Sequence, residues 1–135
     1  MSFEVTKTIY FSYGHRLMSY DGPCKNLHGH NAKVEITLAS ETLNGKGMVA
    51  DFGDIKKKLK RWIDDNWDHR FILCQKDPLF SALKKLDPAV IAVPVNPTAE
   101  NLAKILYEKA KTLGLPVRSV TFWETESSSA IYKDS

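Results

Sequence analysis

The sequence predicts an α+β domain in which helices cover one face of an antiparallel sheet. Residues 3–15 and 28–38 alternate apolar and polar side chains, as half-buried strands do. Residues 53–66 and 99–113 carry apolar side chains at helical spacing instead. A further β-rich segment follows at 117–123. Strands therefore come first, two long helices next and a strand last, which is an order typical of an α+β fold.

The length and composition favour one soluble domain. The 135 residues suffice for one core but not for two, so we expect residues 1–135 to form a single domain. Hydrophobic residues make up 43% and charged residues 26%. No segment approaches the ~20 apolar residues of a membrane helix, and the N-terminal pattern is not that of a secretory signal. We therefore expect a cytoplasmic protein with no membrane partner.

The first strand is predicted at residues 3–15, and His15 continues its apolar parity toward the covered face. A loop with Gly22 and Pro23 follows, and alternation resumes at His28. The turn formers at 43–47 then predict a hairpin with a short returning strand at 48–52.

The first long helix is predicted at 53–66, and a short helix is predicted at 78–86. Residues 90–95 favour an extended segment ending near a proline. The second long helix is predicted to begin after Thr98, a good N-cap, and to stop at Gly114. Strands are expected at 117–123 and 130–132.

The net charge of +3 is only mildly basic, and the lysines concentrate at 56–61 within the first predicted helix. A solvated helix face explains this cluster, while attraction of a polyanionic small substrate is an alternative. No aromatic and basic side chains gather as nucleic-acid binding requires, so we expect no nucleic-acid partner.

His28, Gly29 and His30 form the sharpest motif. Residues two apart on a strand project from one face, so both imidazoles can reach one metal ion, and His15 has the same inward parity. Three neutral imidazole nitrogens suit Zn²⁺ and leave a fourth position open. The alternative is a set of ordinary strand histidines. We predict a zinc site formed by His15, His28 and His30.

Cys24 lies four residues before His28, and three interpretations remain open for it. It is a fourth zinc ligand in a closed site, a thiolate acting as base or nucleophile beside the metal, or a small buried side chain. Cys74 lies in an apolar run at 71–74, where packing in the core is expected.

Two acidic groups complete the candidates. Asp68 precedes His69, and a carboxylate beside an imidazole can orient it for proton transfer, although a surface pair at a helix end is the alternative. Glu124 shares its parity with Val120 and Phe122, and a carboxylate on an apolar face needs a partner. That partner is either a local cation or a ligand edge with two parallel N–H donors, such as a pterin.

Six motifs in this order resemble one known family, and they span about residues 3–132. They are Phe11-Ser12-Tyr13-Gly14-His15-Arg16-Leu17, Cys24-x₃-His28-Gly29-His30-Asn31, Asp51-Phe52-Gly53-Asp54, Asp68-His69-Arg70, Asn96-Pro97-Thr98-Ala99-Glu100-Asn101 and Trp123-Glu124-Thr125-x-Ser127-Ser128. The pattern is similar to that of the 6-pyruvoyl-tetrahydropterin synthase / 6-carboxy-tetrahydropterin synthase family. The resemblance implies the tunnelling fold, a four-stranded antiparallel sheet with two long helices packed on one face. It also implies a homohexamer built as a dimer of trimers, with active sites at subunit interfaces.

The resemblance further implies roles for the candidates. His15, His28 and His30 would hold zinc, and Cys24 would be the general base. Asp68 and His69 would complete a proton relay contributed by a neighbouring subunit. Glu124 would anchor the pterin ring, with Thr98 and Glu100 near it. The substrate would be 7,8-dihydroneopterin triphosphate.

The three-residue gap between Cys24 and His28 resembles the carboxy-tetrahydropterin synthases of queuosine (7-deazaguanine) biosynthesis. We therefore expect a lyase that forms 6-carboxy-5,6,7,8-tetrahydropterin and releases acetaldehyde and triphosphate. The alternative is a 6-pyruvoyl-tetrahydropterin synthase, and a non-enzymatic Cys-His₃ zinc module is a third interpretation. The pair Tyr13-Gly14 departs from the small residues usual before the first zinc histidine, and Tyr13 can reshape the pocket.

Overall fold

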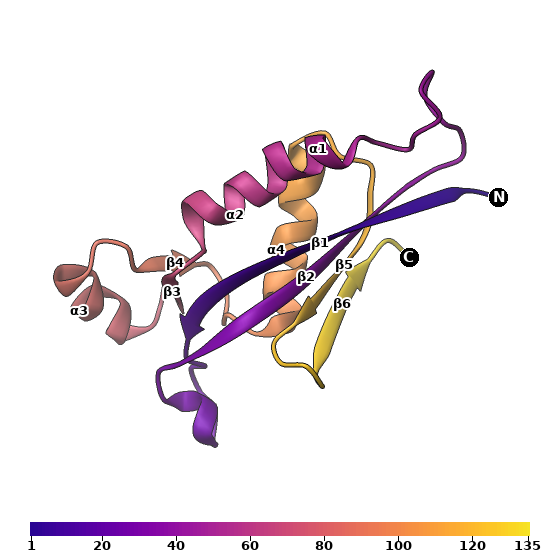
Figure 1. Cartoon of the computed structure of the whole chain (residues 1–135). Helices are drawn as coiled ribbons and strands as arrows, with labels where there is room; N and C mark the ends of the chain where they lie inside the picture. The colour runs from indigo at the N-terminus through magenta and orange to yellow at the C-terminus, as the bar shows by residue number, and fades with distance from the viewer.

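The computed structural model describes residues 1–135, which form one six-stranded sheet and four helices (Figure 1). The strands are β1 (Phe3–His15), β2 (His28–Ser40), β3 (Arg70–Cys74), β4 (Ile91–Val93), β5 (Val117–Trp123) and β6 (Ser129–Lys133). The helices are α1 (Phe52–Ile55), α2 (Arg61–Asn66), α3 (Pro78–Leu86) and α4 (Ala99–Thr112). None of them is both long enough and apolar enough to cross a membrane.

Strands β1 and β2 form a long antiparallel hairpin, and both were predicted from their alternation. The register runs from the Phe3–Ser40 pair to the His15–His28 pair without interruption. One face of the hairpin carries the buried side chains, among them Phe11 and Val34. The alternating pattern therefore sets which side chains face the core, and His15 shares that face.

The prediction of a four-stranded antiparallel sheet is wrong, because the sheet has six strands and is only partly antiparallel. The strand order is β4-β3-β1-β2-β5-β6, and only β1, β2, β5 and β6 pair antiparallel. Strands β3 and β4 extend the sheet in parallel from the end of β1, where β3 pairs with residues 13–15. The apolar run that becomes β3 is too short to distinguish a strand from another buried segment, and it says nothing about pairing direction.

The expected returning strand at 48–52 does not form. Both edges of β2 are already paired, with β1 and β5, so no edge is free for another strand. The chain instead closes a turn in which the Gly47 amide donates to the Asn44 carbonyl at 2.9 Å. Asp51 then caps α1, its carboxylate accepting from the Gly53 amide at 2.8 Å.

The helix predicted at 53–66 is present as α1, a π-helical segment η2 (Lys56–Lys60) and α2 in direct succession. Its apolar stripe faces the sheet, and Ile55, Leu59 and Ile63 are fully buried. The lysines of η2 lie outside this stripe. Their side chains are exposed or half-exposed, as expected of a solvated helix face.

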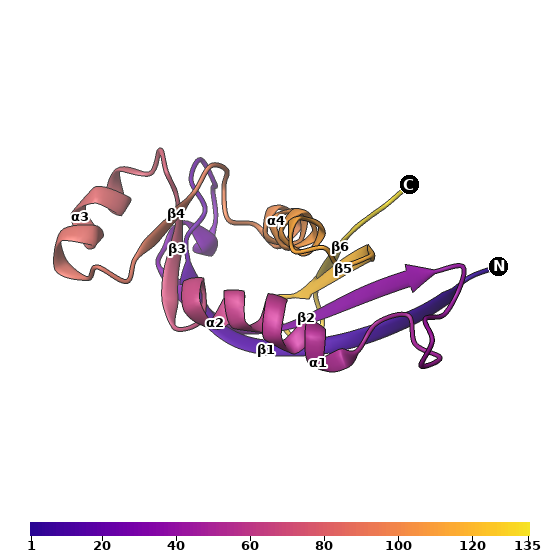
Figure 2. The ribbon, with the colours of Figure 1, turned by 90° about the horizontal axis from the view of Figure 1, so that it is seen from above.

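Helix α4 covers the same face of the sheet. Thr98 caps it as predicted, its hydroxyl accepting from the Asn101 amide at 3.1 Å, and Gly114 ends it with φ +83°. Leu102 and Leu106 are fully buried in one apolar cluster with the inward residues of β1, β2 and β5. Figure 2 shows α4 to one side of β1 and β2, while α3 lies apart beyond β3 and β4.

Candidate functional site

Three histidines meet where the β1–β2 hairpin opens into its connecting loop. His15 ends β1 and His28 begins β2, and the two residues pair directly across the ladder. His30 lies two residues further along β2 and therefore projects from the same face. The ring centroids of these three imidazoles are 4.6 to 5.1 Å apart.

Each of these rings presents an Nε2 atom that is buried and has no hydrogen-bond partner. In His15 and His28 the other ring nitrogen, Nδ1, contacts a backbone carbonyl. Nδ1 of His15 lies 2.7 Å from the Pro97 carbonyl, and Nδ1 of His28 lies 2.7 Å from the Asn26 carbonyl. A carbonyl only accepts, so Nδ1 carries the proton and Nε2 keeps its lone pair. Backbone contacts of this kind orient imidazoles that bind metals.

Glu124 brings a carboxylate to the same place from the end of β5. Its Oε1 atom lies 3.0 Å from Nε2 of His30 and 3.5 Å from Nε2 of His15. One ligand-capable atom from each of the four side chains falls within 4.8 Å of the others. His15, His28, His30 and Glu124 therefore form a group that can hold a metal ion.

The electrostatics of the group suit a cation. Burial is the main reason that the pKa of His30 lies below its ordinary value, and the neighbouring imidazoles act in the same direction. The polar contact with His15 is the main reason that the pKa of Glu124 is lowered; desolvation opposes this, and attraction by the imidazoles in their protonated form adds to it. A neutral His30 imidazole and an ionised Glu124 carboxylate are the forms in which these two groups bind metals.

This donor set fits zinc. Three imidazole nitrogens with one oxygen position are a common arrangement for Zn²⁺, and the orphaned Nε2 atoms are satisfied if an ion accepts their lone pairs. Imidazole also suits nickel, copper and iron, so these donors are compatible with a transition-metal ion and do not select one element.

Cys24 does not join the metal-capable group. It lies in a short 3₁₀ turn, η1 (Pro23–Lys25), within the loop that joins His15 to His28, and it is half-buried. Its carbonyl accepts from the Leu17 amide at 2.9 Å, which closes the base of this loop. The thiol is thus a neighbour of the metal group in sequence and not one of its four members. Cys74 is buried in β3, as core packing predicts.

Asp68 and His69 do contact each other. Nδ1 of His69 lies 2.9 Å from Oδ1 of Asp68, and the same oxygen accepts from the Ser12 amide at 3.0 Å. His69 has a left-handed backbone with φ +61°, and its amide donates to the Ser12 carbonyl at 2.7 Å. These contacts hold the pair at the edge of β1 while 79% of the His69 side chain stays exposed.

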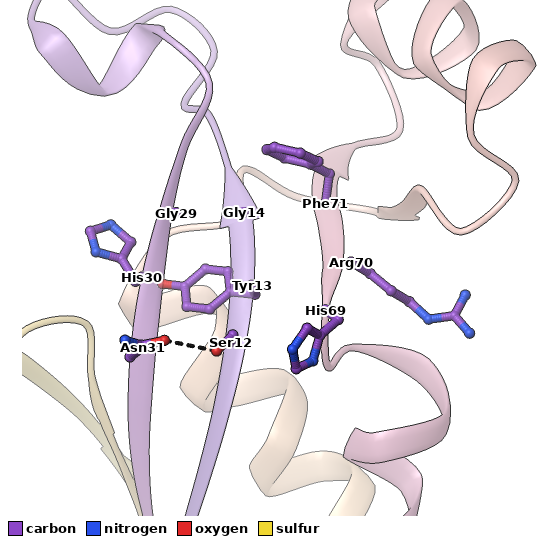
Figure 3. Close-up of a pocket in the computed structure, with 9 residues that line it drawn as sticks. All are labelled: Ser12, Tyr13, Gly14, Gly29, His30, Asn31, His69, Arg70 and Phe71. Atoms are coloured by element: carbon purple, nitrogen blue, oxygen red, sulfur yellow. Dashed lines mark hydrogen bonds between the residues drawn. The ribbon is translucent and has the colours of Figure 1, made fainter.

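His69 borders a pocket of about 340 Å³ that Figure 3 shows in close-up. The pocket also involves Ser12 and Asn31, whose side chains are joined by a 2.7 Å hydrogen bond. By strand alternation these two side chains point away from the face that carries His15 and His30. Ser12 and Asn31 therefore lie on the face of the hairpin opposite His15, although His30 is also among the residues that line this pocket.

Glu124 borders two further pockets. The larger, of about 640 Å³, also includes His30, Lys33 and Trp123. The smaller, of about 380 Å³, includes Glu100, so the two predicted pterin-binding carboxylates share one cavity. Thr98 is absent from both linings, and its hydroxyl is already engaged as the cap of α4.

Some residues of the site gave little signal in the sequence. Inward parity indicated that Glu124 needs a partner, but nothing showed that this partner is the histidine group. The carbonyls of Asn26 and Pro97 carry no side-chain signal at all, because any residue can supply a carbonyl at those positions.

Comparison with known proteins identifies the family. Residues 4–135 match the family model described as 6-pyruvoyl tetrahydropterin synthase. The chain is 33% identical to a 6-carboxy-5,6,7,8-tetrahydropterin synthase of Haemophilus influenzae, over 98% of this chain and 99% of that protein. It is 36% identical to the protein of the same name from Aquifex aeolicus, over 99% of both chains.

Solved structures agree with this relationship. A crystal structure of an uncharacterized protein from Wolinella succinogenes superposes with a TM-score of 0.84 and 29% identity, over 100% of this chain and 99% of that one. The 6-pyruvoyl tetrahydropterin synthase of Caenorhabditis elegans superposes with a TM-score of 0.73 and 27% identity, over 100% and 97%. The chain therefore belongs to the 6-pyruvoyl tetrahydropterin synthase family and is a pterin synthase of the lyase type.

Proposed function

We propose that this enzyme is a zinc-dependent 6-carboxy-5,6,7,8-tetrahydropterin synthase. It acts on 7,8-dihydroneopterin triphosphate, releases acetaldehyde and triphosphate, and serves queuosine biosynthesis. The observation that carries the metal-dependent chemistry is the convergence of three unpaired Nε2 atoms beside a carboxylate. The choice of product is supported by the Haemophilus and Aquifex relatives, which are 6-carboxy-5,6,7,8-tetrahydropterin synthases and match nearly the whole chain.

In this proposal His15, His28 and His30 hold the zinc through Nε2. When bound, the metal would polarise the side-chain oxygens of the substrate and acidify the adjacent carbon-bound protons. The backbone carbonyls on His15 and His28 keep both rings in the tautomer that presents Nε2.

Glu124 anchors the pterin in the same proposal. Its lowered pKa keeps the carboxylate ionised at neutral pH, which suits acceptance of two parallel N–H bonds from a pterin edge. Glu100 lines the same cavity as Glu124, which supports a contact between Glu100 and the bound ring. Thr98 supports this region by fixing the start of α4.

Cys24 acts as the base, and the Asp68–His69 pair moves the second proton. Asp68 holds the imidazole of His69, whose side chain remains exposed and accessible. Because His69 lies outside the metal-capable group of its own chain, we propose that it serves the site of a neighbouring copy. A homohexamer made of two trimers provides such neighbours.

The second candidate is a 6-pyruvoyl-tetrahydropterin synthase, favoured by the structural match to the Caenorhabditis elegans enzyme. The two candidates differ in carbon balance, because only the carboxy product requires loss of a two-carbon fragment. Purified, zinc-loaded protein should be incubated with 7,8-dihydroneopterin triphosphate, and both acetaldehyde and pterin mass should be measured. One acetaldehyde per pterin consumed supports our proposal. Triphosphate release without acetaldehyde supports the second candidate.

A further inference from the structure

Asn96 ties the loop that carries Cys24 to a distant part of the chain. Its side-chain oxygen accepts from the Met18 amide at 2.9 Å, and its side-chain nitrogen donates to the Met18 carbonyl at 3.1 Å. Both backbone groups of Met18 are thus paired with one amide that lies 78 residues further along the sequence. Leu17, the neighbour of Met18, donates its own amide to the Cys24 carbonyl at 2.9 Å. Asn96 therefore reaches Cys24 through the backbone of two loop residues.

Asn96 is itself held in place. It precedes Pro97, and a residue before proline is restricted to extended backbone. Its carbonyl accepts from the Thr98 amide at 2.8 Å and from the side-chain nitrogen of Asn101 at 2.9 Å, at the start of α4. A fixed segment therefore presents the Asn96 side chain, and both polar atoms of that side chain bond to the loop.

The same segment also holds the first of the three histidines. The carbonyl of Pro97, the residue after Asn96, lies 2.7 Å from Nδ1 of His15. His15 and Pro97 are both buried. One short segment thus orients the His15 ring through its main chain and holds the Cys24 loop through a side chain. This arrangement fixes the place of the loop relative to His15.

An amide side chain suits this contact, and the loop needs it. Asn presents a carbonyl oxygen and an NH₂ group side by side, which complement the amide and carbonyl of one backbone residue. Residues 16–27 contain only the three-residue turn η1 as regular structure, so few backbone bonds of their own hold them. Segments of this kind open locally at a small cost in free energy unless side chains tie them down.

We propose that Asn96 is a positioning residue that holds the Cys24 loop in a fixed place relative to His15. Asn96 acts through the backbone of the loop and not on the thiol itself. The inference rests on the proposed function in one respect, since the tether matters to turnover only if Cys24 is the base. Without the tether the loop opens, and the thiol loses its fixed place relative to the histidines.

The test compares two variants. Asn96→Ala removes both side-chain bonds, whereas Asn96→Asp keeps the size and the acceptor but cannot donate to the Met18 carbonyl at neutral pH. The rate at which each thiol reacts with iodoacetamide is measured by mass spectrometry, without substrate. We expect the Cys24 rate to rise by about tenfold in both variants, because each lost bond favours loop opening. Cys74 is buried in β3 and should stay protected.

Asn44→Ala is the matched control. Oδ1 of Asn44 accepts from the Lys46 and Met48 amides at 2.9 and 3.1 Å, so this variant also removes two bonds between a side chain and a loop backbone. That loop follows the end of the hairpin opposite to the Cys24 loop (Figure 1). The thiol rates of Asn44→Ala should equal those of the wild type.

Steady-state turnover separates positioning from a general loss of stability. We expect kcat of Asn96→Asp to fall by about tenfold while KM is unchanged, since the base is misplaced and the pterin contacts remain. In a Cys24→Ala background the same substitution should cause no further fall, because effects that act through one group are not additive. Asn44→Ala should keep the wild-type kcat.

An unchanged Cys24 rate in both Asn96 variants, or an equal rise in Asn44→Ala, would overturn the inference. A parallel rise for Cys74 would also overturn it, since the fold as a whole would then have loosened. Wild-type turnover by Cys24→Ala would instead refute the proposed base. The thiol rates are measured without substrate, so they decide whether Asn96 holds the loop independently of that result.

Discussion

Oε1 of Glu124 lies 3.0 Å from Nε2 of His30 and 3.5 Å from Nε2 of His15. One carboxylate oxygen thus approaches two rings that come from different strands, after the chain has passed through four helices and returned in β5. The metal-capable group is therefore a product of the tertiary fold. It depends on β5 pairing with β2 as much as on the two histidines of β2 itself.

Replacing a histidine of the group should remove the metal without unfolding the chain. His28→Ala takes away one of three nitrogen ligands, and we expect zinc content to fall from one ion per chain to a small fraction. His69→Ala is the matched control, because this imidazole lies outside the group. Elemental analysis after dialysis measures both. Equal zinc loss in the two variants would show that metal binding does not depend on the three-histidine group.

Gly14 should be intolerant of a side chain. A Cβ added there would lie 2.3 Å from a ring carbon of Phe71, which covers Gly14 across the parallel β1–β3 pair. We expect Gly14→Ala to lower the free energy of unfolding by about 1–3 kcal/mol, as overpacking does. Gly45→Ala, where a Cβ meets no atom within 4 Å, is the control. Chemical denaturation decides, and an unchanged midpoint in Gly14→Ala would contradict the packing described here.

The Arg16–Asp77 pair should make stability depend on acid pH. Nε of Arg16 donates to Oδ2 of Asp77 at 2.7 Å and Nη2 donates to Oδ1, while Oδ1 also accepts from the Leu79 amide at 2.9 Å. These bonds, led by those from Arg16, lower the pKa of Asp77. Since the folded pKa is below the unfolded one, the stabilisation is present above the ordinary value near 3.8 and is lost as pH falls through the folded pKa.

Asp77→Asn keeps a capping oxygen for α3 but loses the charge, so we expect it to cost about 2 kcal/mol at neutral pH. The difference between wild type and variant should shrink as the pH falls below 4. Urea midpoints measured from pH 7 to pH 2 provide the comparison. A difference that stays constant over this range would refute the linkage.

The hairpin and the long helices were predictable because their patterns are local. Alternation through Val34 and Ile36 sets one face of β2, and the cap at Thr98 with the stop at Gly114 sets the bounds of α4. The three histidines were predictable for the same reason, since spacing on a strand decides which face a side chain shares.

The features that the sequence did not predict all depend on contacts between residues far apart in the chain. Residues 70–74 carry no period that distinguishes a parallel strand from another buried segment, so β3 was not expected, whereas β4 lies within the extended segment predicted at 90–95. The region 48–52 was assigned a strand because its residue types allow one, whereas pairing of β2 with β5 left no edge for it. The approach of Glu124 to the histidines likewise depends on where β5 ends in space.

We propose that this lyase holds a metal with an open position at its three histidines and uses Cys24 as its base. Zinc content and turnover of 7,8-dihydroneopterin triphosphate should be measured together on wild type and Cys24→Ala. We expect the variant to keep its zinc and its thermal midpoint while turnover falls by about 10²–10⁴, the range for loss of a general base. Loss of zinc together with the fold would instead make Cys24 a ligand of a closed structural site and contradict the enzyme mechanism proposed here.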